Sequence, residues 1–397
     1  SMGPEIFGYY ALFVAYVEVI NKVFNFQIFE AFIKFATDFD LQNKADKIPM
    51  LIKYCFLVDF FSLSIAFIVA ILLSDFFIIN FKVPSDYNIV LKILSMSIIS
   101  HIFYNSSIGI FRFFDQFKLQ ASTSILISIV KCLSFIFIAL FDPSFKNFAI
   151  ALIISQFLGM VLTFVFIKRV LNKNNLNLTS IFSNRIDFNF MRKIKLLSFV
   201  IYKTFESSLR MISRQFDLLL LGKFYSPDLV GFFRIAKEIT NIISKIVDPI
   251  YQAIYPELAK LLSSDNYQAA KNVSVRISLY CGFFGIFSYI LFLLFGEFAI
   301  IKVFGKAFTD SYALTAIYFI AILLSIISLP LAPILNAKGF VKEGFKNQII
   351  TNLLYLPITF VLIVKFGAFG ASMAYIFYYI SWVCLTLNTI RYKKVFV

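Results

Sequence analysis

Long apolar stretches alternate with short polar connections along almost the whole chain. Eleven of these stretches, each about twenty or more residues long, can cross a hydrocarbon core about 30 Å thick as helices. The predicted spans cover residues 6–33, 51–74, 89–110, 119–140, 148–168, 196–222, 229–252, 277–296, 311–334, 344–364 and 368–390. The connections are too short for a soluble domain, so the pattern predicts an all-α polytopic membrane protein.

Composition and charge agree with this class and predict an orientation. Hydrophobic residues make up 60% of the 397 residues, 53 of them are Phe, and the net charge is +15. Most of the 37 Lys and Arg residues fall in alternate connections, and the side richer in Lys and Arg is normally cytoplasmic. The C-terminus is therefore expected in the cytoplasm.

An internal repeat divides the chain. The segment "GPEIFGYY" at residues 3–10 resembles "SPDLVGFF" at 226–233, and the same offset of 223 aligns the turns that begin at residues 114 and 337. We interpret each segment as an outside turn in which Gly permits a bend. The second copy begins with the span 196–222, and the first copy lacks its counterpart before Gly3. This predicts two pseudo-symmetric six-helix bundles with the first helix missing: a lobe at 1–170, a cytoplasmic loop at 171–195 and a lobe at 196–397.

Ionisable residues form a stripe along the span 196–222. At 100° per residue, Lys203, Glu206, Arg210, Arg214 and Asp217 fall within an arc of about 80°. A central Lys, Arg or Asp costs roughly 2.5 to 3.5 kcal/mol on the membrane-insertion scale, and each apolar residue recovers only about 0.3 to 0.6. The stripe is therefore predicted to face a central water-filled cavity.

The neighbouring helices continue this pattern. Arg234, Lys237, Glu238, Lys245 and Asp248 share one face of the span 229–252, and Glu18 belongs to a similar cluster in the first copy. Ion pairs within a helix, Glu206 with Arg210 and Arg214 with Asp217, remain an alternative explanation. The excess of bases over acids in the residues 196–252 favours an anionic ligand.

Three apolar segments carry a resemblance to a known family. "SRQFDLLLLGKFYSPDLVGFF" from residue 213, "FNFQIFEAFIKFA" at 24–36 and "SSIGIFRFFDQFKLQA" at 106–121 resemble, in order, segments of bacterial O-antigen flippases. These are polysaccharide transporters of the multidrug, oligosaccharidyl-lipid and polysaccharide (MOP) exporter superfamily. The resemblance implies a V-shaped, MATE-like membrane transporter rather than an enzyme. It also implies movement of an undecaprenyl-pyrophosphate-linked oligosaccharide across the bacterial inner membrane, from the cytoplasmic to the periplasmic leaflet, by alternating access.

The resemblance also implies roles for the charged residues. Substrate-binding cations would be Arg210, Arg214, Arg234, Lys237, Lys245 and Lys203. The acids Glu18, Glu206, Asp217, Glu238 and Asp248 would balance these charges or couple transport to H⁺ or Na⁺. Partners would be the lipid-linked oligosaccharide, membrane lipids and the polysaccharide polymerase machinery, with no nucleic acid. The alternatives are a cation-coupled drug exporter, a lipid II flippase, and a non-transporting scaffold or inactive fragment.

The remaining signals are weaker. His101, the only histidine, is expected to be packed and hydrogen-bonded, and Pro330 with Pro333 should bend the ninth predicted span. No phosphate-binding Gly-rich loop is present, which argues against ATP use by this chain. The four cysteines have no metal-ligand spacing, so neither a metal site nor another cofactor is predicted.

Overall fold

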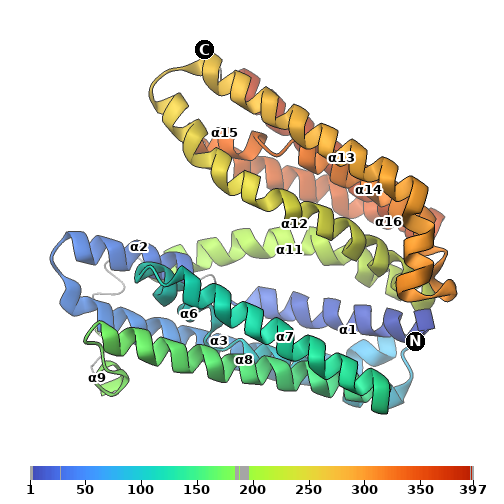
Figure 1. Cartoon of the computed structure of the whole chain (residues 1–397), viewed down its shortest axis with the longest axis horizontal. Helices are drawn as coiled ribbons and strands as arrows, with labels where there is room; N and C mark the ends of the chain where they lie inside the picture. The colour runs from blue at the N-terminus through green and yellow to red at the C-terminus, as the bar shows by residue number, and fades with distance from the viewer. Residues whose placement is uncertain (1–2, 27, 184–186, 188–195, 394, 396–397) are drawn as a thin grey trace. The chain divides into compact units, whose positions relative to one another are not determined.

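The computed structural model describes residues 3–26, 28–183, 187, 196–393 and 395, and every regular element in this part of the chain is a helix (Figure 1). The chain divides into two compact units. One, here called the N-terminal unit, is Phe13–Met211. The other, the C-terminal unit, is Ile212–Val397 together with Ser1–Leu12. Both boundaries fall inside helices, α1 (Gly3–Phe24) and α11 (Leu196–Phe224), so each of these helices contributes to both units.

The N-terminal unit contains residues 13–24 of α1, residues 196–211 of α11 and all the elements between them. These elements are α2 (Ile28–Leu41), η1 (Ala45–Lys47), α3 (Ile48–Asn80), η2 (Ser85–Tyr87), α4 (Asn88–Ser95), α5 (Ser97–Ser100), α6 (Tyr104–Phe113), α7 (Phe117–Phe141), α8 (Phe145–Lys173) and α9 (Leu178–Ser183). Helices α7 and α8 pack against each other along their lengths, and α2 packs on α6 (Figure 1).

The C-terminal unit contains residues 3–12 of α1, residues 212–224 of α11 and the remaining helices. These are α12 (Pro227–Ser263), α13 (Tyr267–Phe304), η3 (Lys306–Phe308), α14 (Ser311–Ile327), α15 (Leu331–Ala337) and α16 (Val341–Tyr392). Helix α14 packs against α12, α13 and α16, so it lies at the centre of this group.

The predicted class of polytopic all-α membrane protein is confirmed. In the described residues, eight helical segments are long and apolar enough to cross a membrane. Helices α11 and α12 were predicted as spans, and neither is among these eight. The two predicted spans at 344–364 and 368–390 form the single long element α16.

Two breaks interrupt the later spans, one at the predicted boundary between 344–364 and 368–390 and one at the predicted bend near Pro330. Helix α16 changes direction at Gly367, whose φ of 58° belongs to the left-handed region that favours glycine. The predicted bend near Pro330 is a break between α14 and α15.

The predicted span 6–33 falls in one apolar segment, Gly3–Leu41, that is long enough to cross a membrane, but it is two helices, because the chain leaves the helix between α1 and α2. Asn105 of α6 donates hydrogen bonds to the side chain of Asn25 and, at 3.0 Å, to the carbonyl oxygen of Phe26. Asn25 in turn donates to Asn21 at 3.2 Å. These amides satisfy polar groups exposed by the break, which an apolar environment would otherwise leave unpaired.

The repeat predicted from the sequence is visible in the backbone. Left-handed residues end corresponding elements of the two copies, each within one residue of the 223-residue offset. The pairs are Asn43 and Asp265, Lys82 and Gly305, and Asp115 and Gly339. Their recurrence supports the predicted duplication, because residues other than glycine adopt this conformation only rarely.

The predicted role of the glycines in the repeated segment was wrong. Gly8 and Gly231 lie inside α1 and α12, where each allows close contact with the other copy. A Cβ atom on Gly8 would lie 1.8 Å from the carbonyl oxygen of Pro227, and one on Gly231 would lie 2.5 Å from the carbonyl oxygen of Pro4. The contact is reciprocal, since the 223-residue offset relates Gly8 to Gly231 and Pro4 to Pro227.

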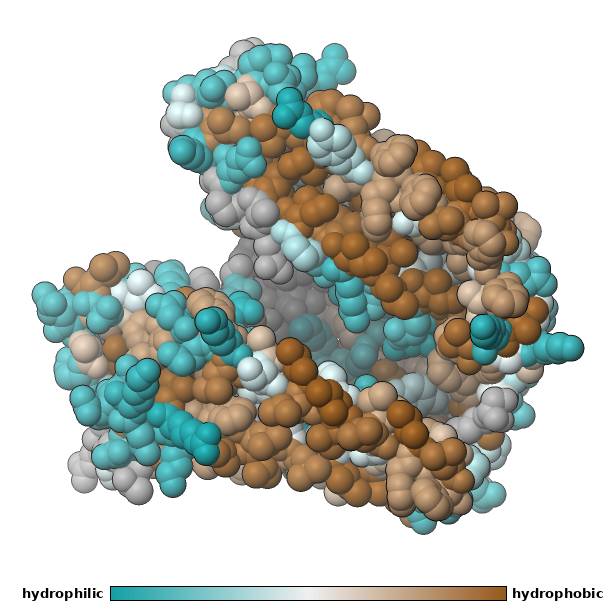
Figure 2. Space-filling view, viewed as in Figure 1, coloured by the Kyte–Doolittle hydropathy of each residue, from teal (hydrophilic) through white to brown (hydrophobic). Residues whose placement is uncertain are grey.

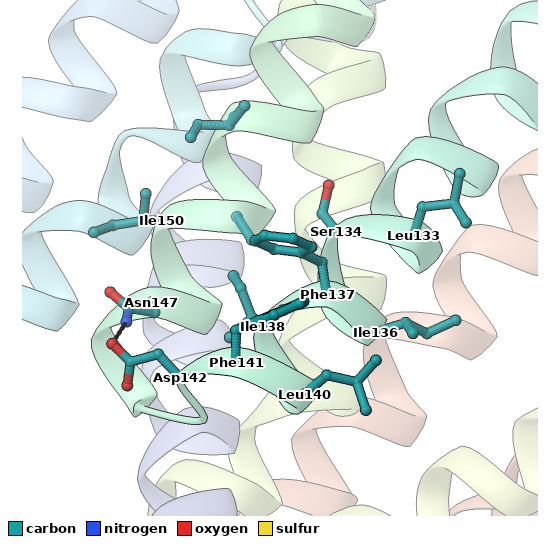
Figure 3. Close-up of a pocket in the computed structure, with 12 residues that line it drawn as sticks. Leu133, Ser134, Ile136, Phe137, Ile138, Leu140, Phe141, Asp142, Asn147 and Ile150 are labelled. Carbon is teal, nitrogen blue, oxygen red and sulfur yellow. Dashed lines mark hydrogen bonds between the residues drawn. The ribbon is translucent and has the colours of Figure 1, made fainter.

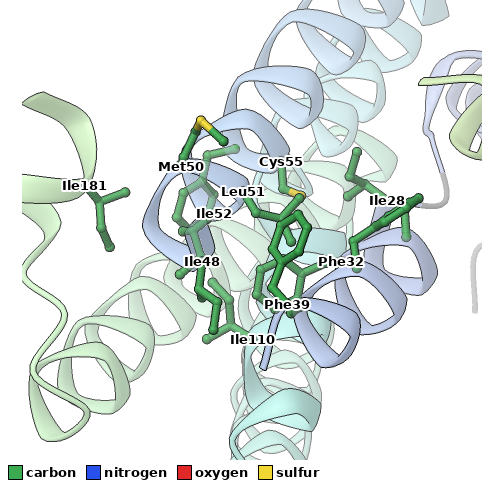
Figure 4. Close-up of a cluster of buried hydrophobic side chains, with 14 of the residues drawn as sticks. Ile28, Phe32, Phe39, Ile48, Met50, Leu51, Ile52, Cys55, Ile110 and Ile181 are labelled. Carbon is green, nitrogen blue, oxygen red and sulfur yellow. The ribbon is translucent and has the colours of Figure 1, made fainter. Parts of the chain in front are cut away.

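Each unit has an apolar cluster near the ends of its helices. In the N-terminal unit it joins α2, α3, α6 and α9 through side chains that include Phe32, Leu51, Ile110 and Ile181 (Figure 4). In the C-terminal unit it joins α12, α13, α15 and α16. Figure 2 shows hydrophobic residues over the middle of α7 and α8 and hydrophilic residues at one end of this helix pair, as expected where helices meet lipid.

We expect Gly8→Ala to destabilise the protein, because overpacking a tight contact costs typically 1–3 kcal/mol and here the contacted atom belongs to the backbone. The midpoint of thermal unfolding in detergent should fall by several degrees. Gly344→Ala in α16 is the matched control, since its Cβ would meet no atom closer than 3.9 Å. Equal midpoints for the two variants would contradict the packing role of Gly8.

Candidate functional site

A buried ion pair joins α11 to α12 in the C-terminal unit. Asp217 of α11 is completely buried, and Lys237 of α12 places its Nζ 2.8 and 2.9 Å from the two carboxylate oxygens. The same Nζ donates to the carbonyl oxygen of Arg214 at 2.5 Å. An unpaired charge at this position would be costly, so the pair lets two otherwise poorly inserting helices pack together.

The ion pair bears on two expectations. The alternative pairing of Asp217 with Arg214 is not the one seen, because Asp217 takes its partner from the next helix. Lys237 was predicted as a cation for substrate, yet its ammonium group is occupied by Asp217 and by the Arg214 carbonyl. Arg214 is an exposed residue, and among the described side chains no carboxylate pairs with it.

A cluster of tyrosines surrounds the charged group. Tyr318 of α14 stacks on Tyr375 of α16 with ring centroids 4.8 Å apart, and Tyr375 stacks on Tyr378 at 5.6 Å. Tyr379 and Tyr355 meet these rings edge to face. The Arg214 guanidinium lies near the phenol groups of Tyr318, Tyr375, Tyr378 and Tyr379.

Polar groups of α16 extend this cluster. Gln348 donates a hydrogen bond of 2.7 Å to the hydroxyl group of Tyr378 and a longer one, 3.3 Å, to Asn352. The hydroxyl group of Tyr355 is buried without a hydrogen-bond partner in the described structure. Amide, phenol and guanidinium groups of α11, α14 and α16 thus lie close together.

The second half of the predicted stripe on α12 is more exposed. Arg234 pairs with Glu238 at 2.5 Å, one helical turn apart, and Glu238 is about half exposed. Lys245 and Asp248 are both exposed. The face expected on α12 is therefore present: Arg234 and Glu238 balance each other's charge, and Lys245 and Asp248 further along are exposed.

Four of the predicted site residues lie elsewhere or outside the described part. The side chains of Lys203, Glu206 and Arg210 fall outside the described residues, although the helix that carries them is described. Glu18 lies partly buried in the N-terminal unit. Convergence of the faces from both copies on a single cavity stays a prediction.

The tyrosine cluster was missed by the sequence analysis. Tyr375, Tyr378 and Tyr379 have the i, i+3, i+4 spacing that places side chains on one face of a helix, and this signal was available. It was hidden because aromatic residues are abundant throughout the chain. Tyr318 and Tyr355 come from other helical segments, so only tertiary structure brings them to the same place.

The arrangement suits an anionic, hydroxylated ligand. Arg offers a planar fork of donors to phosphate or carboxylate, and phenol and amide groups exchange hydrogen bonds with hydroxyl groups. Among the described residues, no three His, Cys, Asp or Glu side chains are grouped to hold a metal ion.

Residues 2–313 match the family model for "Polysaccharide biosynthesis protein". The chain belongs to this family. Inner membrane protein YghQ of Escherichia coli K12 is 22% identical over 318 residues, which is 79% of this chain and 87% of that protein. A putative O-antigen transporter of the same organism is 26% identical over 167 residues, 39% of this chain and 38% of that protein.

Solved structures with the same fold confirm the predicted MATE-like class. An inward-facing multidrug resistance MATE family transporter of the MOP superfamily superimposes with a TM-score of 0.79 at 13% identity, over 99% of this chain and 92% of that one. The lipid II flippase MurJ, in an inward closed conformation, gives 0.71 at 14% identity, over 99% and 83%. At such low identity the likeness establishes the fold.

We expect Asp217→Asn and Lys237→Met each to lower stability strongly, because removing one partner of a buried pair costs about 3–5 kcal/mol. Replacing both partners by apolar residues should recover much of the loss. Thermal unfolding of the two single variants and the double variant Asp217→Leu with Lys237→Met measures this coupling.

The matched control is Arg234→Gln on the same helix. Its pair with Glu238 is partly exposed and should contribute no more than about 1 kcal/mol. Independent, additive losses from Asp217 and Lys237 would show that the two side chains do not depend on each other.

Proposed function

We propose that the protein is a flippase for a lipid-linked oligosaccharide. It would move an undecaprenyl-pyrophosphate-linked repeat unit from the cytoplasmic to the periplasmic leaflet of the bacterial inner membrane by alternating access. The observation that carries this proposal is the arginine and tyrosine cluster of the C-terminal unit. The family description and the name of the putative O-antigen transporter support it.

The anionic part of such a substrate needs fixed cations. Arg214 is the strongest candidate, since it is an exposed residue beside the tyrosines and no carboxylate pairs with it in the described structure. Arg210, Arg234, Lys203 and Lys245 remain candidates that would act at other points of the same face. Lys237 acts indirectly in this proposal, by neutralising Asp217 and holding the backbone of Arg214.

The sugars would meet the tyrosines. Tyr378 and Tyr379 are partly exposed, and the hydroxyl group of Tyr378 already accepts a hydrogen bond from Gln348. Aromatic rings present an apolar face to the C–H groups of a sugar, while their hydroxyl groups bind its polar edge. A surface of this kind recognises sugars by many weak contacts, which explains why no short motif names the sugar.

The ion pair offers a route for coupling to H⁺ or Na⁺. Protonation of Asp217, or replacement of Lys237 by a metal cation, would release the lysine and loosen α12 from α11. The other acids of the site, Glu18, Glu206, Glu238 and Asp248, would then balance charge.

Lipid II flipping is the second candidate, favoured by the likeness to MurJ. Lipid II carries the same pyrophosphate chemistry, so Arg214 would serve either substrate.

A drug exporter is less well supported, because exposed Arg214 would repel the cationic drugs that an acidic cavity attracts. Complementation of an O-antigen flippase-null strain and of a lipid II flippase-depleted strain separates the two flippase functions.

We expect Arg214→Ala to reduce surface polysaccharide at least tenfold in a strain whose own copy is deleted, with normal protein abundance in the membrane. Arg214→Lys should restore part of the loss, since lysine keeps the charge and loses the fork of donors. Arg276→Ala, an exposed arginine of α13, is the matched control and should leave polymer unchanged. Normal polymer in Arg214→Ala would reject the proposed role of the cluster.

A further inference from the structure

Helix α3 of the N-terminal unit carries a fully buried acid, Asp59, inside a segment that is long and apolar enough to cross a membrane. Its Oδ2 atom accepts a hydrogen bond from the backbone N–H of Ser106 at 2.9 Å and another from the Ser106 hydroxyl group at 2.5 Å. Its Oδ1 atom is buried without a hydrogen-bond partner in the described structure. Only one oxygen of this carboxyl group is therefore satisfied.

No cation balances this carboxyl group among the described side chains. The elements that pack around α3 carry several charged or titratable groups: Glu18 and Lys22 on α1, Glu30 and Lys34 on α2, Lys92 on α4, Arg112 on α6 and His101 just before α6. None of them acts on Asp59; the groups that do are Ser106 and the buried thiol of Cys55, one turn earlier on α3. His101 is hydrogen-bonded elsewhere, as expected from the sequence, with Nδ1 2.7 Å from the backbone oxygen of Ser97.

Exposed acids of the same unit are partnered differently. Asp142, at the turn between α7 and α8 beside an apolar groove, is exposed and accepts a hydrogen bond of 2.7 Å from Asn147 (Figure 3). Asp75, near the end of α3, pairs with Lys92 at 3.3 Å. Water also reaches both of these carboxylates, so their charge costs little. Asp59 has neither water nor a cation beside it.

The contact with Ser106 connects Asp59 to the break between α1 and α2. Ser106 lies in the first turn of α6, where backbone N–H groups have no partner within the helix, so Asp59 caps this helix from α3. The preceding residue, Asn105, donates to the side chain of Asn25 and to the carbonyl oxygen of Phe26. Two adjacent residues of α6 thus join the carboxyl group to the break.

We propose that Asp59 is a proton-binding site: the carboxyl group holds a proton on Oδ1 at neutral pH, and losing that proton tightens the hold of α6 on the break between α1 and α2. An ionised carboxylate with one unpaired oxygen is far more costly in an apolar interior than a neutral acid, whose unpaired O–H group carries no net charge. Once ionised, the group accepts stronger hydrogen bonds from Ser106, because charge-assisted bonds are the stronger ones. The site uses none of the residues proposed to bind substrate.

Infrared spectroscopy of the full chain tests the proton directly. A neutral carboxylic acid has a C=O stretch at higher frequency than a carboxylate or an amide, so the protein is measured at pH 7 in D₂O and in a maltoside detergent, which has no carbonyl group. We expect this acid band in the wild type and its loss in Asp59→Asn. Asp142→Asn is the matched control and should leave the band unchanged, because Asp142 is exposed and ionised.

Ser106→Ala tests the site without removing its carboxyl group. This variant removes the hydroxyl donor and keeps the backbone donor. Because the lost bond favours the ionised form, the acid band should persist to a higher pH than in the wild type. The same midpoint in both proteins would mean that the band does not belong to the group bonded to Ser106, and would overturn the proposal.

Amide hydrogen exchange tests the link to the break. Asp59→Asn resembles the protonated form, so residues 21–26 should exchange at the same rate in this variant and in the wild type at pH 7. Above the pH at which the acid band disappears, exchange should be faster in the variant. Equal rates at both pH values would show that the break does not respond to Asp59.

Two infrared results would overturn the proton site. One is loss of a carboxylate band, rather than an acid band, in Asp59→Asn at pH 7. The other is a carboxylate band that shifts on addition of Na⁺, which would mean that a metal cation occupies the place given to the proton. Thermal unfolding shows that each variant remains folded, and none of these readouts depends on what the protein transports.

Discussion

The pair between Asp217 and Lys237 is the interaction on which the C-terminal unit depends. Helices α11 and α12 carry more charge than a lipid-facing helix tolerates, and a membrane protein can keep such helices only by pairing or hydrating their charges. The pair neutralises two of these charges, and the hydrogen bond from Lys237 holds the backbone carbonyl of Arg214 in place. Arg214 and the partly exposed Tyr378 and Tyr379 then remain as the groups available to a ligand.

The hydropathy pattern was sufficient to predict the helices, because the hydrocarbon core requires every spanning segment to satisfy its own backbone hydrogen bonds. A local signal also located the bend at Pro330. The break after Asn25 was not predictable, since the amide that stabilises it comes from Asn105, eighty residues away.

The sequence predicted the charged faces of α11 and α12, but it did not predict that Asp217 pairs with Lys237. Helical spacing identifies which residues share a face, but Arg214 and Lys237 are both within reach of Asp217, and only packing decides between them. The tyrosines were missed for a different reason: aromatic residues are so frequent in this chain that their helical spacing did not stand out. Their function arises from the meeting of α14 with both parts of α16, which no single stretch of sequence records.

The reciprocal contact of Gly8 and Gly231 links the histories of the two repeats. Each glycine faces the backbone of the other copy. A larger residue at either glycine would therefore clash with a helix more than two hundred residues away in the sequence. After a gene duplication, most positions are released to diverge independently. These four, the two glycines and the two prolines, are not: they constrain each other as subunits of a symmetric dimer do, although both now belong to one chain.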